Sequence, residues 1–192
     1  MFNAHSKCAT PKRILIEGEA GVGKTTLLKY ITEQWAKNLN PNLQEKFKLV
    51  MYVDLRTARS GNLLETILEQ CLPDYYKRSS DELYNIFKMY QKRALFILDG
   101  YENIKTLEDE FLDLLHKAMF RECSIVMATR SNHVSRALLK QFDTRLLVAG
   151  IEADAREGMI GEWMGLFILH LNIYRLCMKY LKEGSRIRIQ KI

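Results

Sequence analysis

The residues best suited to chemistry lie near the amino terminus, where positions 18–25 read Gly-Glu-Ala-Gly-Val-Gly-Lys-Thr. This is a complete G-x-x-x-x-G-K-[ST] pattern between an apolar run at 14–16 and an amphipathic stretch that begins at Thr25. Glycines let the backbone turn its N–H groups around a polyphosphate. The lysine offers a cation to β- and γ-phosphates, and the threonine hydroxyl offers a ligand to Mg²⁺. The pattern predicts a phosphate-binding loop that leads into the positive end of a helix.

We expect nucleotide contacts from the whole loop and from the first residue of the helix beyond it. The predicted nucleotide-binding residues are Gly18, Glu19, Ala20, Gly21, Val22, Gly23, Lys24, Thr25 and Thr26. A glycine-rich turn that merely caps a structural helix is the alternative interpretation. The order of strand, loop, Lys-Thr and helix favours the phosphate site.

A second candidate element follows the apolar run 94–98, where Asp99 ends what reads as a buried strand. A carboxylate in that place suits Mg²⁺, usually through water, so Thr25 and Asp99 are the predicted metal residues. The other interpretation is that Asp99 caps the following turn. Glu102 is a candidate to orient or deprotonate an attacking water, although a solvated loop glutamate has the same sequence signal.

A third candidate element is the run 124–128, which ends in Thr129 and Arg130. A guanidinium matches phosphate oxygens in a bidentate way, so Arg130 is a candidate contact to the γ-phosphate. A surface salt bridge is the alternative role for Arg130. Asp54 and Arg56 follow another apolar run in a comparable place, but they carry no pattern that assigns a role.

The elements that must position these residues are indicated by hydrophobic spacing. Five short, continuous apolar runs predict strands that are buried on both faces, at 14–16, 49–53, 94–98, 124–128 and 146–148. Apolar residues at helical spacing predict helices over 27–35, 63–71, 83–90 and 111–119, the third with a capping box from Ser79 and Glu82. We therefore predict an α/β fold of the P-loop NTPase kind, with a five-stranded, mostly parallel sheet flanked by helices on both faces. Ligands of such sheets bind at the carboxyl ends of the strands.

Composition limits the other possibilities. With 192 residues, 47% of them hydrophobic, the chain suits one globular domain. Cys8, Cys71, Cys123 and Cys177 are scattered without metal-ligand spacing, so we expect reduced thiols in a cytoplasmic protein, without disulfides or zinc. The amino-terminal residues lack the apolar core of a signal peptide.

The formal net charge of +6 is concentrated near the carboxyl end, where residues 175–192 hold six basic residues and one acidic residue. A solvated tail explains this better than a specific nucleic-acid partner. The uncharged run 163–174 is shorter than the roughly 20 apolar residues of a membrane span, so we expect no transmembrane segment. It reads instead as a helix with an apolar face that favours self-association.

Three segments together resemble the NACHT family of STAND-type P-loop NTPases: residues 14–28, 95–103 and 125–130. The distinguishing feature is that Gly100, a small residue, follows the aspartate and that the acidic Glu102 stands two positions further on. Related helicases and AAA-type ATPases usually place glutamate directly after the aspartate. The resemblance extends over about residues 12 to 160 and includes 147–151 as the exit from the last strand.

The resemblance implies a switch that binds ATP or ADP with Mg²⁺. Lys24 would contact the β- and γ-phosphates, Thr25 and Asp99 would serve Mg²⁺, Glu102 would assist hydrolysis, and Arg130 would act as sensor 1. Members of this family alternate between a closed ADP form and an oligomerising ATP form, often in innate immune or cell-death signalling. The implied partners are adenine nucleotide, further copies of the chain and other NACHT-containing proteins.

Two departures from the family pattern shape the functional alternatives. Asn103 stands where the family often has an acidic residue, which favours slow or absent hydrolysis. The last proline is Pro73, so the proline of a helical lid is missing after residue 150. We expect an N-terminal tail at 1–12, a nucleotide-binding domain at 13–150 and a partial helical segment with a basic tail at 151–192. A non-catalytic interaction or decoy module and a small P-loop kinase are the alternatives to the switch.

Overall fold

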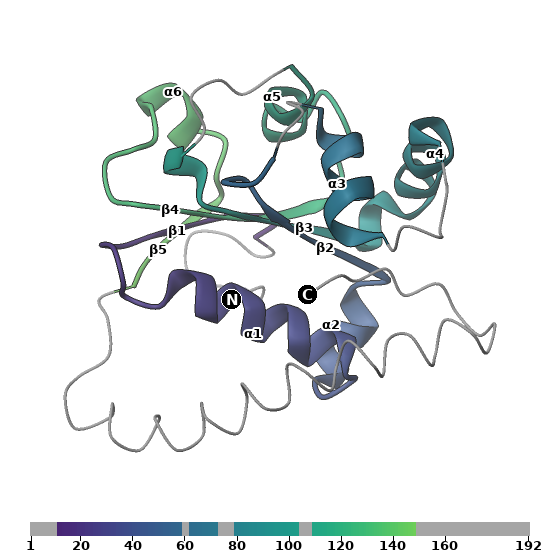
Figure 1. The fold of residues 1–192 in the computed structure, drawn as a ribbon, viewed down its shortest axis with the longest axis horizontal. Coiled ribbons are helices and arrows are strands. Elements are labelled where there is room, and N and C mark those ends of the chain that lie inside the picture. The colour runs from purple at the N-terminus through teal and green to yellow at the C-terminus, as the bar shows by residue number, and fades with distance from the viewer. Residues whose placement is uncertain (1–10, 59–61, 73–78, 104–108, 149–192) are drawn as a thin grey trace.

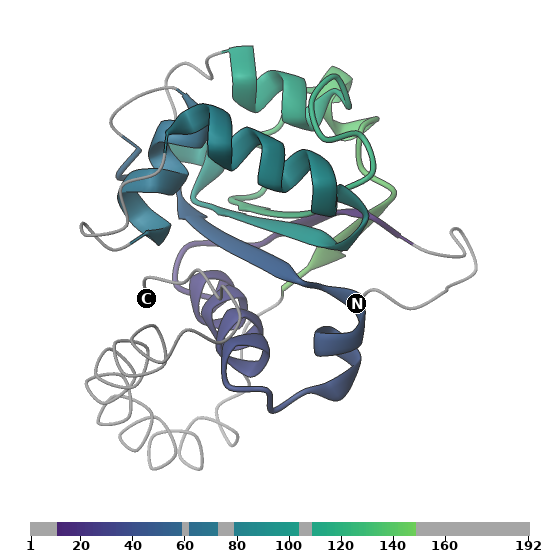
Figure 2. The same cartoon turned by 90° about the vertical axis from the view of Figure 1, so that its right-hand side faces the viewer.

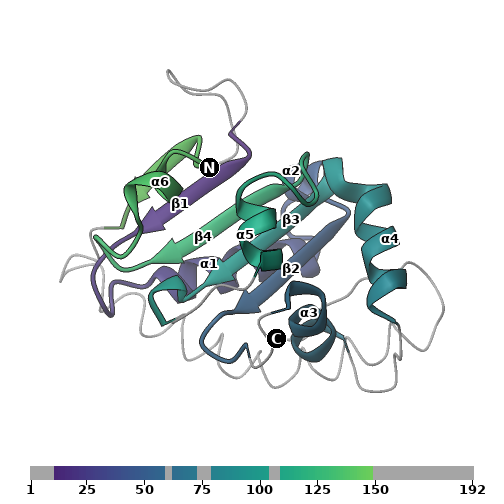
Figure 3. The same ribbon diagram turned by 90° about the horizontal axis from the view of Figure 1, so that it is seen from above.

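The computed structural model describes residues 11–58, 62–72, 79–103 and 109–148. They form a five-stranded sheet between two layers of helices (Figure 1). The strands are β1 (Arg13–Glu17), β2 (Leu49–Asp54), β3 (Ala94–Asp99), β4 (Ser124–Thr129) and β5 (Thr144–Leu147). Their order across the sheet is β2-β3-β4-β1-β5, and each neighbouring pair is parallel. Figure 3 shows the arrows of the central strands pointing the same way. The predicted α/β class and the parallel five-stranded sheet are confirmed.

Helices cover both faces of the sheet, as predicted. On one face lie α1 (Lys24–Ala36) and α2 (Pro41–Lys46), and on the other lie α3 (Leu63–Cys71), α4 (Ser80–Tyr90), α5 (Asp109–Leu115) and α6 (Arg136–Leu139) (Figures 1 and 2). Two short 3₁₀ turns, η1 (Gln91–Arg93) and η2 (Tyr101–Asn103), flank β3. The expected helical segment at 151–192 and the apolar run within it lie outside the described residues.

Alternation along the buried strands explains how one sheet serves two hydrophobic cores. In β1, Ile14 and Ile16 belong to the core that includes Leu28 and Trp35 of α1, whereas Leu15 belongs to the core beneath α3, α4 and α5. β1, β3 and β4 are buried along their whole length, as their continuous apolar runs predict. This burial fixes the carboxyl ends of these strands as one rigid edge.

The edge strand β5 departs from the prediction. It begins at Thr144, earlier than the predicted run, and its residues alternate between half-buried and exposed. Leu147, at its end, is 75% exposed. Among the described residues, β5 is an edge strand that pairs with β1 alone, which is consistent with this exposure.

Helix boundaries follow local capping signals. The predicted capping box of α4 is confirmed, because the Ser79 hydroxyl accepts from Glu82 N at 3.2 Å while the Glu82 carboxylate accepts from Ser79 N. α2 was not predicted, although Asn40 caps it and Pro41 occupies its first position, two ordinary signals of a helix start.

α5 is shorter than the periodicity predicts and ends at Leu115 rather than at 119. Lys117 adopts a left-handed conformation with φ of 65°, and Ala118 N donates to Asp113 O at 2.8 Å, which closes the helix. The buried Arg13 guanidinium then donates to the carbonyls of Leu114 and Leu115, at 2.8 and 2.9 Å. A β1 side chain therefore satisfies the final carbonyl groups of α5.

Two of the four cysteines lie in the described residues. Cys71 and Cys123 are both free and buried. Burial raises the pKa of each thiol to about 12, so both stay protonated at neutral pH. Cys8 and Cys177 lie outside the described residues. In the same described part of the chain, no helix has the length and apolar character needed to cross a membrane.

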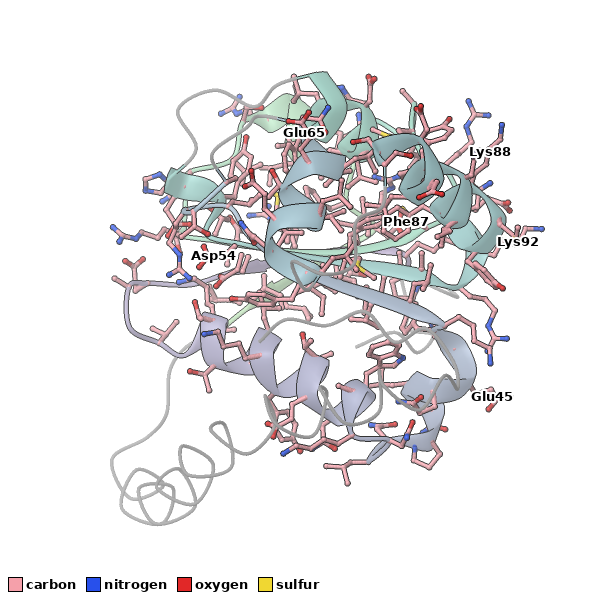
Figure 4. All side chains as sticks on the ribbon, turned by 45° about the vertical axis from the view of Figure 1, so that its right-hand side comes forward. Glu45, Asp54, Glu65, Phe87, Lys88 and Lys92 are labelled. Atoms are coloured by element: carbon pink, nitrogen blue, oxygen red, sulfur yellow. The ribbon has the colours of Figure 1, made fainter. Side chains whose placement is uncertain are left out.

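The clearest test of the packing concerns Phe87, which Figure 4 labels between α4 and the sheet. Its ring is fully buried, 5.1 Å from the ring of Phe96 and 5.6 Å from that of Phe120. We predict that Phe87→Ala lowers the free energy of unfolding by about 3–5 kcal/mol, because it leaves a cavity among aromatic rings. Urea denaturation followed by circular dichroism measures the loss.

The matched control is Met89→Ala on the same helix, because Met89 is 75% exposed. Its effect should stay within about 0.5 kcal/mol. Equal losses for the two variants would contradict the described packing of α4.

Candidate nucleotide-binding site

The loop between β1 and α1 has the conformation that its glycines allow. Gly21 and Gly23 have φ angles of 78° and 97°, in the left-handed region that side chains disfavour. A Cβ atom added at either position would meet nothing within 4 Å. The requirement for glycine at these positions therefore comes from the backbone conformation, and the space beside the loop is open.

Gly18 has a packing role in addition to the predicted one of keeping a path clear for phosphate. A Cβ there would lie 2.6 Å from Val148 O and 2.9 Å from Val22 Cγ2. The chain leaving β5 is held against this point, since Val148 N donates to Glu17 O at 2.8 Å. An ion pair between Arg145 Nη2 and Glu17 Oε2, at 2.6 Å, joins the same two strands. Gly18 therefore permits close packing of β1 against the exit of β5.

Lys24 and the first turn of α1 supply positive charge beside the loop. Lys24 Nζ donates to Gly18 O at 2.7 Å and to Glu19 O at 2.8 Å, so the loop carbonyls hold the ammonium group. Gly23, the N-cap of α1, has no side chain to accept from the first amides, and the first turn has no acidic residue. The amino end of α1 therefore retains the donors and the dipole charge that suit an anion.

Asp99 is the buried centre of the predicted metal site. It lies at the end of β3 and is 2% exposed. Its Oδ2 atom accepts from the Thr25 hydroxyl at 2.7 Å, from the Tyr52 hydroxyl at 2.8 Å and from Arg56 Nη2 at 3.1 Å. The structure thus brings Thr25 and Asp99 together, as the sequence predicts, and adds two donors from β2 and the residues after it.

Arg56 is held over Asp99 by two features. Its Nε donates to Asp54 Oδ1 at 2.7 Å and its Nη2 to Asp54 Oδ2 at 2.8 Å. Its side-chain stem passes over Gly100, where an added Cβ would lie 2.9 Å from Arg56 Cγ. Gly100 also has a φ of 81°. A side chain at Gly100 would therefore clash with the Arg56 side chain. The sequence pattern alone does not show this reason for a small residue after Asp99.

The ionisation of this cluster is fixed by its neighbours. Hydrogen bonding to Asp54 raises the pKa of Arg56, which stays a cation. Burial, followed by the Asp99 carboxylate, raises the pKa of Tyr52 far above its usual range. The tyrosine therefore remains a neutral hydroxyl donor at every physiological pH.

Glu102 and Arg130, predicted as separate catalytic candidates, form a pair. Arg130 Nε lies 3.4 Å from Glu102 Oε1, and Arg130 N donates to Glu102 Oε2 at 3.3 Å. Glu102 is only 12% exposed at its side chain, whereas the Arg130 side chain is 50% exposed. The contact joins η2 to the residue after β4. A change in the position of either side chain therefore removes a partner of the other.

The donor set fits a nucleotide with Mg²⁺. The Thr25 hydroxyl and the Asp99 carboxylate are adjacent hard oxygen ligands, which Mg²⁺ prefers. The Thr129 hydroxyl is buried and finds no hydrogen-bond partner among the described residues. It stands at the end of β4, in register with Glu17 at the end of β1. An unsatisfied hydroxyl at this edge fits a polar ligand or an ordered water.

Sequence reasoning missed Tyr52 and did not assign Asp54 and Arg56. The signal for Asp54 was its place at the end of β2, where it is in register with Asp99 on β3. Tyr52 and Val53 are neighbours on β2 and point to opposite faces of the sheet. Tyr52 packs against the core beside α1, and Val53 belongs to the core on the other face. The remaining predicted loop residues, Ala20, Val22 and Thr26 among them, lie in the β1–α1 segment as expected.

The parallel sheet, the glycine loop and the Asp99–Thr25 pair define a P-loop NTPase. A comparison with protein families matches residues 12–165 to the NACHT domain. The chain belongs to the NACHT domain family, which confirms the resemblance seen in its motifs.

The relatives that this chain matches are much longer than it. It is 35% identical over 150 residues to NLR family CARD domain-containing protein 4 of Rattus norvegicus, covering 77% of this chain and 14% of that protein. It is 32% identical over 178 residues to Baculoviral IAP repeat-containing protein 1 of Homo sapiens, covering 92% of this chain and 12% of that protein. The chain thus spans a small part of each relative.

Solved structures share the fold at low sequence identity. The Aeropyrum pernix ORC2 protein has a TM-score of 0.52 at 14% identity, with 78% of this chain and 45% of that chain covered. The FIGL-1 AAA domain has a TM-score of 0.50 at 16% identity, with 80% and 48% covered. These likenesses support the P-loop NTPase fold.

The packing role of Gly18 makes a testable distinction within the loop. We predict that Gly18→Ala lowers the free energy of unfolding by about 1–3 kcal/mol without any nucleotide, because the added methyl group overpacks against backbone. Urea denaturation measures the change. Glu19→Ala, at the exposed neighbouring position, should change stability by no more than about 0.5 kcal/mol. A Gly18→Ala variant as stable as the parent would refute the packing role.

Proposed function

We propose that this chain is an ATP- and ADP-binding switch domain of the NACHT type, with slow hydrolysis. The observation that carries the proposal is the position of the loop, with Lys24 beside it, next to the Asp99–Thr25 pair. A phosphate cradle and a pair of magnesium ligands at the same edge of a parallel sheet suit a nucleoside polyphosphate.

The roles of the residues follow from their chemistry. The loop amides and the Lys24 ammonium bind the phosphates, and Thr25 and Asp99 hold the metal. Mg²⁺, when bound, neutralises charge on the phosphate oxygens. Glu102 orients or deprotonates a water, and Arg130 contacts the γ-phosphate. Because Arg130 and Glu102 are paired, binding of the terminal phosphate to Arg130 alters the partner of Glu102 as well.

The choice of adenine rests on family membership and on the fold relatives. The ORC2 structure holds ADPNP and ADP, and the FIGL-1 domain holds ADP. The NLR and IAP-repeat relatives support a role in innate immune or cell-death signalling, with self-association or pairing with other NACHT proteins, in the cytoplasm. Family membership favours this switch over a small kinase.

Nucleotide binding is tested through stability. We predict that ADP with Mg²⁺, at about 100 times its Kd, stabilises the chain by about 2.7 kcal/mol, since the ligand binds only the folded state. Lys24→Ala should abolish this gain, because it removes the cation that the loop holds. Thermal unfolding with and without nucleotide measures both effects.

The matched control is Lys88→Ala, because Lys88 lies on the outer side of α4, far from the loop (Figure 4). This variant should keep the full stabilisation by nucleotide. Lack of stabilisation of the parent chain by any nucleotide would refute the proposal. The melting temperature of nucleotide-free Lys24→Ala shows whether the substitution also weakens the fold.

A non-catalytic interaction module is the second candidate, favoured by Asn103 in the sequence and by the engagement of Glu102 with Arg130. Such a module would bind nucleotide and pair with longer NACHT proteins without turnover. It shares the nucleotide site with the switch and differs from it only in hydrolysis.

Single-turnover hydrolysis of ATP separates the two candidates. If the chain is a slow hydrolase, Glu102→Gln should lower the rate by about 10²-fold or more while ADP affinity stays the same. The amide keeps the size of the side chain but cannot accept a proton. Tight ATP binding with no turnover in the parent chain would support the interaction module and contradict hydrolysis.

A further inference from the structure

We propose that Arg56 is a counter-cation of Asp99 that weakens the dependence of nucleotide binding on Mg²⁺. The inference rests on the proposed nucleotide site and adds a residue that sets its metal response. The proposed function gives roles to the loop, to Thr25 and Asp99, and to the Glu102–Arg130 pair. It gives none to the Asp54–Arg56 pair, and this inference supplies one.

The first step is geometric. Arg56 Nη2 lies 3.1 Å from Asp99 Oδ2, the same oxygen that accepts from the Thr25 hydroxyl. A fixed positive charge therefore stands beside the atom pair best suited to hold Mg²⁺. A guanidinium cannot be deprotonated under physiological conditions, so the charge is permanent.

The second step is that Asp54 and Gly100 hold the Arg56 side chain in a fixed position beside Asp99. Both of its contacts to Asp54 are short, at 2.7 and 2.8 Å, and they form a two-point grip on the guanidinium. The stem lies against Gly100, at a point where any side chain would displace it. Gly100 and Asp54 thus position Arg56, which in turn contacts Asp99.

The third step is electrostatic. The Asp99 side chain is 3% exposed, so water screens it weakly from its neighbours. A guanidinium at this carboxylate reduces the attraction that it offers to a divalent cation and repels that cation directly. The same charge is attractive to phosphate oxygens. Arg56 should therefore favour nucleotide without metal relative to nucleotide with metal.

The two partners of Arg56 give predictions of opposite sign. Arg56→Gln leaves Asp54 and Asp99 both negative, so the gain in ADP affinity on adding Mg²⁺ should rise by about tenfold over the parent chain. Asp54→Asn removes one negative charge beside Asp99, while the amide oxygen can still accept from Arg56 and keep it in place, so the gain should fall below that of the parent. Arg56→Lys keeps the positive charge and should stay closer to the parent than Arg56→Gln.

The experiment is calorimetric titration of the full 192-residue chain with ADP, in EDTA and at a series of free Mg²⁺ concentrations. Tyr52→Phe separates charge from orientation, since it removes one donor to Asp99 without changing any charge. Arg121→Gln is the control for loss of an arginine, because Arg121 is exposed and its Nε donates to Lys117 O in the segment between α5 and β4. Circular dichroism of each variant confirms that it is folded.

Opposite shifts for Arg56→Gln and Asp54→Asn, with a smaller shift in Tyr52→Phe and none in Arg121→Gln, would support the proposal. An unchanged Mg²⁺ response in folded Arg56→Gln would overturn it, and so would an equal shift in Tyr52→Phe. In both cases ADP still binds, which distinguishes failure of this inference from failure of the proposed function. If the parent chain binds no ADP at any Mg²⁺ concentration, both proposals fall together.

Discussion

One buried carboxylate connects the parts of this site. Asp99 accepts hydrogen bonds from Thr25 on α1, from Tyr52 on β2 and from Arg56 after β2. A buried carboxylate is costly unless its lone pairs are satisfied and its charge is balanced. These contacts satisfy its Oδ2 atom and place a cation beside it, and in doing so they join α1, the end of β2 and the end of β3. The same oxygen that holds the fold together at this edge is the proposed ligand of Mg²⁺, so structure and binding share one group.

The sheet order makes this convergence possible. β1 lies between β4 and β5, so the loop that leaves β1 starts beside the ends of both strands. Gly18 packs against the chain after β5, and Thr129 ends β4 in register with Glu17. Every strand is parallel to its neighbours, which brings all of these chain segments to one edge. The fold thereby collects side chains from distant parts of the sequence around a loop that by itself offers amides, one lysine and the Thr25 hydroxyl.

The sequence was most informative where chemistry is local. The loop, the apolar strands and the α4 capping box depend on adjacent residues, and the structure has them at or near the predicted positions. The sequence was silent where chemistry depends on register. Arg56 reaches Asp99 only because β2 and β3 pair with Asp54 opposite Asp99, and the pairing of Glu102 with Arg130 depends on the approach of η2 to β4. Gly100 was noticed as a family feature, but its physical reason, the stem of Arg56 above it, is a tertiary contact.

The central claim is that the amides of the loop between β1 and α1 bind the phosphates of an adenine nucleotide. Hydrogen–deuterium exchange of the full chain, with and without ADP and Mg²⁺, tests it directly at those amides. The account predicts slower exchange over residues 18–26 when ADP is present, with unchanged exchange in α4 on the far side of the sheet. Exchange over residues 18–26 that is the same with and without saturating ADP would contradict it.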